Sequence, residues 1–90
     1  MKIDFEHITV FADIGQTIPA VADERKEIAN IIYSQGQGIE CHALALKIYN
    51  GDKDTEYSDE EVTLIMKFVE HFFAPCFIDA MRGIIQKEEE

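Results

Sequence analysis

Three helix-breaking stretches divide the C-terminal two thirds of this sequence into short segments. They are the glycine-rich stretch at 34–38 (SQGQG), the pair Asn50-Gly51 and the pair Ala74-Pro75. Glycine is costly inside a helix, and proline pushes the residue before it out of helical angles. Between the breaks, apolar residues recur at the spacing of a helix face. The sequence therefore predicts about four short helices in one small domain.

The third of these helices is predicted to be the central one. Its start matches a capping box, in which Ser58 accepts from the backbone N–H of Glu61 and the Glu61 side chain accepts from the backbone of Ser58. The stripe that follows is apolar over its whole length: Val62, Ile65, Met66, Val69, Phe72 and Phe73. Pro75 suits the first turn of a new helix, so a fourth helix is expected over 75–86.

The first two helices have weaker signals. Asp23 is predicted to cap the first helix, and Gly36 is predicted to end it in a left-handed conformation. The second helix is expected over 39–49, with a broad apolar face formed by Ile39, Ala43 and Leu46 and the neighbouring Leu44 and Ile48. Small side chains on this helix would allow close approach by another helix.

The N-terminal residues favour β structure. The segment 3–12 is rich in β-branched and aromatic residues, with a turn signal at Gly15, and 17–21 is a plausible second arm of a hairpin. The predicted fold is mainly α with a small β part. One domain spans 1–90, with a β-rich element over 1–22, a helical core over 23–86 and a frayed acidic tail over 87–90.

Composition excludes several classes of function. The 90 residues carry a formal net charge of −10, which repels nucleic-acid phosphates and anionic membranes. No apolar run approaches the roughly 20 residues that a membrane span needs, and the N-terminus does not resemble a signal peptide. Cys41 and Cys76 are expected to be reduced and buried, as is typical of a cytoplasmic protein.

The acidic stretch between the second and third helices raises the question of calcium binding. Counted from Asn50, oxygen ligands fall at the positions of an EF-hand loop: Asn50, Asp52, Asp54, Glu56, Ser58 and Glu61. Against this, Thr55 stands where the loop needs glycine, and Glu61 cannot easily serve both a metal and the capping box. We expect a structural turn over 50–61, with calcium binding as an alternative.

Catalytic and zinc-binding patterns are weak. Zinc binding would need Cys41 and His42 to meet His71 and Cys76, but no paired ligand spacing is present. There is no glycine-rich phosphate loop with its lysine. We expect no enzymatic activity and no cofactor.

The order of helices and caps resembles a group of small accessory proteins encoded in phages and prophages. The matching stretches are residues 28–32 (IANII), 43–50 (ALALKIYN) and 59–62 (DEEV), and the likeness extends over about residues 26–81. The resemblance implies a non-enzymatic role in contact with another phage-type protein.

Protein–protein interaction is therefore the function expected, through an accessory or structural factor. Helical spacing cannot bury every aromatic side chain, so Tyr33, Tyr49, Phe73 and Phe77 are the candidates for a contact surface; the alternative is that they complete the core. The partner could be a basic protein or a second copy. A further alternative is an acidic protein that mimics nucleic acid to occupy a basic partner.

Overall fold

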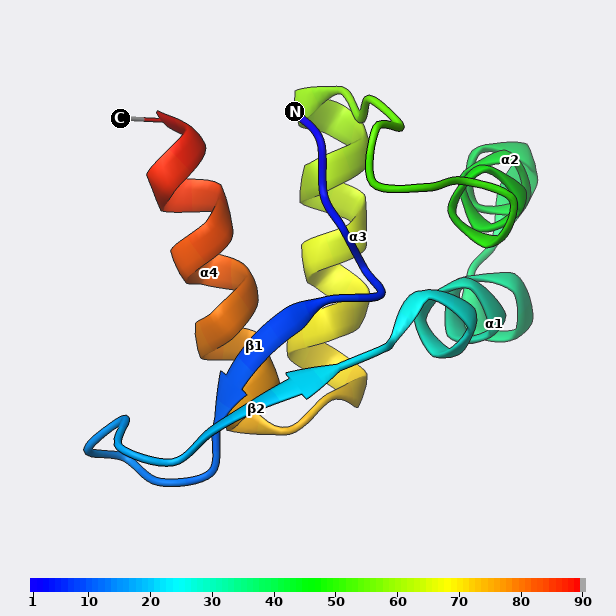
Figure 1. The fold of residues 1–90 in the computed structure, drawn as a ribbon. Helices are drawn as coiled ribbons and strands as arrows, with labels where there is room; N and C mark the ends of the chain where they lie inside the picture. Colours follow the sequence, from blue (N-terminus) through cyan, green and yellow to red (C-terminus); the bar gives the residue numbers. More distant parts are fainter. Residues whose placement is uncertain (90) are drawn as a thin grey trace.

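The computed structural model describes residues 1–89, which form a two-stranded hairpin followed by four helices (Figure 1). The elements are β1 (Ile8–Phe11), β2 (Pro19–Ala22), α1 (Arg25–Gln35), α2 (Gly38–Tyr49), α3 (Asp59–Phe72) and α4 (Pro75–Glu89). Helix α3 lies between the α1–α2 pair on one side and α4 on the other (Figure 1). The predicted mainly α fold, with a small N-terminal hairpin and a central third helix, is confirmed.

The hairpin is antiparallel, with Ile8 opposite Ala22 and Phe11 opposite Pro19, and β1 packs against α4. Asp13 organises its turn by accepting hydrogen bonds from the Thr17 hydroxyl at 2.6 Å and the Thr17 backbone at 2.9 Å. The bond from the Thr17 hydroxyl is the main reason that the pKa of Asp13 lies below its ordinary value. Because Thr17 belongs to this turn, the second strand begins at Pro19 and not at 17.

The boundaries of α1 differ from the predicted ones. Glu24 occupies the cap position without a capping side-chain bond, and Asp23 accepts only a long 3.4 Å bond from the Arg25 backbone. The predicted left-handed end at Gly36 is also wrong, because Gly36 is extended. Glycine is needed there for space, since a Cβ would lie 2.5 Å from the Ile32 carbonyl oxygen. The positive φ of 86° falls at Gly38, the first residue of α2.

The start of α3 is as predicted and the end of α4 is not. Both bonds of the capping box between Ser58 and Glu61 are present. Helix α4 continues to Glu89, so the predicted frayed tail is helical over 87–89, and residue 90 lies outside the described residues. The physical reason is that Gln86 and the residues after it are good helix formers with no glycine or proline among them.

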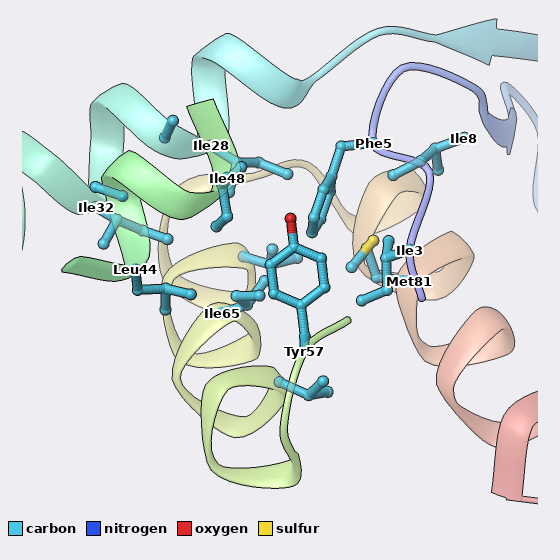
Figure 2. Packing of buried hydrophobic residues seen from close by; sticks show 14 of the residues in the cluster. Ile3, Phe5, Ile8, Ile28, Ile32, Leu44, Ile48, Tyr57, Ile65 and Met81 are labelled. Atoms are coloured by element: carbon cyan, nitrogen blue, oxygen red, sulfur yellow. The ribbon is translucent and has the colours of Figure 1, made fainter. Parts of the chain in front are cut away.

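A single apolar core joins the N-terminal segment, β1 and the four helices (Figure 2), whereas β2 contributes no buried residue to it. Tyr57, from the turn before α3, lies at its centre and is 1% exposed. The Phe5 ring meets the Tyr57 ring edge-on, with 5.6 Å between their centroids. Tyr57 also ties the N-terminus in place, because its backbone N–H donates to the Met1 carbonyl at 2.8 Å. The N-terminal segment is therefore part of the core and not an appendage.

Arg25 is buried at the meeting point of three segments. Its Nε donates to Glu6 at 3.1 Å, and its Nη1 donates to the Ile48 carbonyl at the end of α2, also at 3.1 Å. Nη2 and the Tyr57 hydroxyl have no hydrogen-bond partner in the described part of the chain. Burial raises the pKa of Tyr57, and the nearby guanidinium of Arg25 opposes that shift. Arg25 thus joins the N-terminal segment, α1 and α2.

The two cysteines differ. Cys41 is buried, as expected, whereas Cys76 is exposed, so the expectation that it is buried is wrong. The inward face of α4 is formed by Phe77 and Met81, four residues apart. Cys76 precedes Phe77 by one residue and so points away from that face.

Candidate interaction surface

Helix α2 is apolar on two sides. Its inward side buries Cys41, Leu44, Ala45 and Ile48. Its outward side presents Ile39, Leu46 and Tyr49, which are 79%, 45% and 47% exposed. The broad apolar face predicted for this helix therefore divides between its two sides: Leu44 and Ile48 are buried, whereas Ile39, Ala43 and Leu46 are exposed. With eight apolar residues among the twelve of this helix, spacing alone cannot identify the buried side.

The outward residues follow a regular order. Ile39, His42, Leu46 and Tyr49 are separated by three, four and three residues, and all four are exposed. This is the spacing of a seam that packs against another helix. We call these four residues the outer stripe.

A groove runs along the outer stripe between α1 and α2. It has a volume of about 240 Å³ and is lined by Ala29, Asn30, Tyr33, Ala45, Leu46 and Tyr49. Tyr33 is 61% exposed, and its ring centroid lies 5.7 Å from that of His42 on the outer stripe. The structure therefore brings two of the four predicted contact residues, Tyr33 and Tyr49, to one surface.

The other two predicted contact residues belong to the core. Phe77 is 4% exposed, so its prediction as a contact residue is wrong. Phe73 is half-buried against the core, with its ring centroid 4.8 Å from that of Phe77. The break at Pro75 turns the chain so that Phe77, at the start of α4, packs inward beside Phe73. For these two residues the alternative that they complete the core is correct.

Two larger hollows differ from this groove in their lining. One, of about 680 Å³, lies beside α3 and includes Asp59, Lys67 and Glu70. The other, of about 650 Å³, lies between the hairpin turn and α4 and includes Asp13 and Asp79, among others. The α1–α2 groove has no charged residue in its lining. Of the three hollows, the α1–α2 groove is the most suitable for an apolar partner surface.

The polar groups in the first half of the acidic loop form hydrogen bonds within the protein. The Asn50 side chain donates to the Leu46 carbonyl at 3.0 Å and so closes the end of α2. Asp52 accepts from the Asp54 backbone at 2.8 Å, and its own backbone donates to the Thr55 hydroxyl at 2.9 Å. These are the bonds of a tight polar turn.

The second half of the loop also has structural partners. The Glu61 carboxylate accepts from Lys47 at 2.8 and 3.0 Å and from the Ser58 backbone at 2.9 Å. Burial raises the pKa of Glu61, but these hydrogen bonds and the Lys47 charge outweigh it and hold the pKa below its ordinary value. Glu56 pairs with the Met1 α-amino group at 3.3 Å. The interpretation of 50–61 as a structural turn accounts for each of these contacts.

Metal-ligating side chains do not converge in the described residues. Among the side chains that the structure describes, no group of three or more His, Cys, Asp or Glu residues is arranged to hold a metal ion. The four carboxylates among the residues predicted for calcium, Asp52, Asp54, Glu56 and Glu61, therefore form no such group, and neither do Cys41, His42, His71 and Cys76. Across residues 1–89, no helix is both long and apolar enough to cross a membrane.

Sequence reasoning missed the outer stripe as a surface, although its signal was present. The helix contains two apolar stripes, and only one can face the core. Comparison of this chain with protein-family models, curated proteins and solved structures finds no match.

Proposed function

We propose that this protein is a non-enzymatic protein–protein interaction module, and that its outer stripe and the adjoining groove bind a helix of a partner protein. One observation carries the proposal. Helix α2 lies at the margin of the fold, yet it is apolar on the side that faces away from the core (Figure 1). A peripheral helix of a monomeric protein normally presents charged and polar residues to water.

The chemistry of the surface supports a helical partner. The stripe of Ile39, His42, Leu46 and Tyr49 has the spacing that accepts side chains from an apposed helix. Tyrosine at the rim contributes a large apolar ring with few rotatable bonds, and aromatic residues are enriched at interfaces. In a chain of which 29% is charged, an uncharged groove is a local departure from the rest of the surface.

The resemblance to prophage accessory proteins gives this proposal a setting. It implies that the partner is encoded nearby and that the protein acts as an accessory or structural factor. Mimicry of nucleic acid stays a prediction from composition.

The proposal is tested by capture of partners from cells that carry the neighbouring genes. Three baits are compared: the wild-type chain, Leu46→Lys and the control Ile14→Lys. Ile14 is fully exposed on the hairpin turn, so the control makes the same chemical change away from the stripe. The tag is placed at the C-terminus, because Ile3 and Phe5 near the other end are buried.

We expect a protein that the wild-type and Ile14→Lys baits retain and that Leu46→Lys loses at least tenfold. That protein is then purified and titrated against each bait by calorimetry. A captured set that Leu46→Lys leaves unchanged contradicts the proposal.

A further inference from the structure

The geometry points to a specific occupant for this surface: we propose that the partner helix is α2 of a second copy, so that two chains associate through antiparallel outer stripes. This inference rests on the proposed function and narrows it. In the resulting dimer, the second α2 lies along the groove between α1 and α2, with the two α1 helices flanking it.

The first argument is the symmetry of the stripe. Its intervals of three, four and three residues read the same in both directions. Two antiparallel copies can therefore meet with Ile39 opposite Tyr49 of the second copy and His42 opposite Leu46 of the second copy. A two-fold interface requires a surface that is complementary to itself in this way.

The second argument is the size of the flanking residues. The positions on either side of the stripe hold Gly38, Ala43, Ala45 and Asn50. Gly38 and Ala43 are exposed, and Ala45 forms part of the floor of the groove. Small side chains at these positions let two helix axes approach to about 8 Å, the near end of the usual range. At that distance the stripe residues of each copy reach the groove of the other.

The third argument is charge. Two copies that each carry −10 repel one another, so they can associate only where carboxylates are kept apart. The charged residues of α2 are Glu40 and Lys47, and neither belongs to the stripe or the groove lining. Lys47 is bonded to Glu61 on the side toward α3.

The lack of charged residues along the stripe and the groove also weighs against a partner of opposite charge. Charged residues beside a helix seam are the usual means by which helices select a different partner. The flanking positions here are uncharged, so the seam offers no such selection. A second copy, which presents the same uncharged stripe, fits it without any charge complement.

The interface is expected to be small. A helix of twelve residues is about 18 Å long, and four stripe residues with Tyr33 give a contact near the lower end of specific interfaces. We therefore expect a dimer that dissociates in the micromolar range. Its mass is to be followed by sedimentation equilibrium over a wide range of concentration.

The first experiment compares wild-type, Leu46→Lys and Ile14→Lys chains. For wild-type and Ile14→Lys we expect the mass to rise from 10.3 kDa toward twice that value as concentration increases. Leu46→Lys is expected to stay monomeric at concentrations at least tenfold higher. Circular dichroism checks that each variant remains folded, which is expected because both positions are exposed.

A charge-complement experiment tests the stripe directly. One chain carries His42→Glu with Leu46→Glu, and the other carries His42→Lys with Leu46→Lys. Each is expected to be monomeric alone, and their mixture is expected to form a heterodimer. Two helices that meet through these positions produce this result, whereas loss of fold or association through another surface does not.

Two outcomes overturn the inference: a monomeric wild-type chain at all concentrations, or a dimer that Leu46→Lys leaves intact. A monomeric wild-type chain can still capture another protein in a Leu46-dependent way. In that case the inference that the partner is a second copy is wrong, and the proposed function stands. If neither association depends on Leu46, both proposals fail.

Discussion

Helices α2 and α3 differ in what they expose to solvent. Helix α3 buries Val62, Ile65 and Val69, and its exposed positions are mainly polar or charged: Asp59, Glu60, Thr63, Lys67, Glu70 and His71. Phe72, its last residue, is the exception. Helix α2 buries a comparable stripe, but Glu40 and His42 are the only Asp, Glu, Lys, Arg or His residues among its exposed positions.

The positions of α2 and α3 in the fold would predict the opposite distribution of exposed apolar surface between them. The central helix has neighbours on two sides, and α2 lies at the margin of the fold (Figure 1). The central helix nevertheless has a mainly polar exposed surface, whereas the marginal helix has a second apolar surface. Folding needs only the inward stripe of α2. The outer stripe gains less from folding of a single chain, because the part of its apolar area that stays exposed contributes no burial energy. It is therefore the part of α2 that association can use.

Substitutions within α2 give the sharpest test that its inward side serves folding and its outer stripe serves association. Ile48→Ala removes a fully buried side chain, and we expect the free energy of unfolding to fall by about 2–5 kcal/mol. Leu46→Ala removes a side chain that is already half-exposed, so the loss is expected to stay below about 1 kcal/mol. Urea unfolding of dilute protein, where association does not contribute, measures both. Equal losses in the free energy of unfolding would mean that the two sides of α2 contribute equally to folding.

Features set by neighbouring residues could be predicted from the sequence. The start of α3 follows from Ser58 and Glu61, three residues apart, and both bonds of the capping box are present. The division into short helices followed from Gly51 and Pro75, and the break before α4 lies where proline dictates. The hairpin followed from a β-rich segment and a turn at Gly15.

Features set by packing between distant segments could not be predicted. Tyr57 lies within the turn predicted over 50–61, and its burial depends on Phe5 and Met1, more than fifty residues earlier. The burial of Arg25 depends on the Ile48 carbonyl at the end of another helix. Which of the two apolar stripes of α2 is buried also depends on packing between distant segments, because it is set by where α1 and α3 lie. The candidate site was accordingly half predicted: Tyr33 and Tyr49 were identified, and the stripe that joins them was not.

The starts of the two helices sharpen the comparison at a smaller scale. Ser58→Ala removes the side chain that accepts from Glu61, and we expect a loss of about 1 kcal/mol in the free energy of unfolding. The matched control is Gln37→Ala at the start of α2, where the side chain makes no capping bond. This control is expected to leave stability within about 0.5 kcal/mol of wild type. Thermal unfolding of the three chains in parallel gives both values, and an equal loss at Gln37 would contradict the assignment of the cap.

The smallest expected effect concerns the ion pair that joins the two helices. Glu61→Gln keeps a residue suited to the capping box but loses the charge that Lys47 contacts at 2.8 Å. Since the pKa of Glu61 is lowered by folding from its ordinary value of 4.5, its contribution is present above that pH and is lost as pH falls through the lowered pKa. Both side chains are partly exposed, so we expect the variant to be less stable by no more than about 1 kcal/mol at pH 7.

The difference between wild type and Glu61→Gln should shrink toward zero as the pH falls through the lowered pKa of Glu61, because the wild-type carboxyl is then increasingly protonated. Glu60→Gln is the control, since Glu60 is exposed and has no ion pair or side-chain hydrogen bond among the contacts of residues 1–89. Urea unfolding at several pH values separates the two variants. A deficit of Glu61→Gln that persisted undiminished at low pH would show that packing or the cap, and not the charge, joins α3 to α2 at this point.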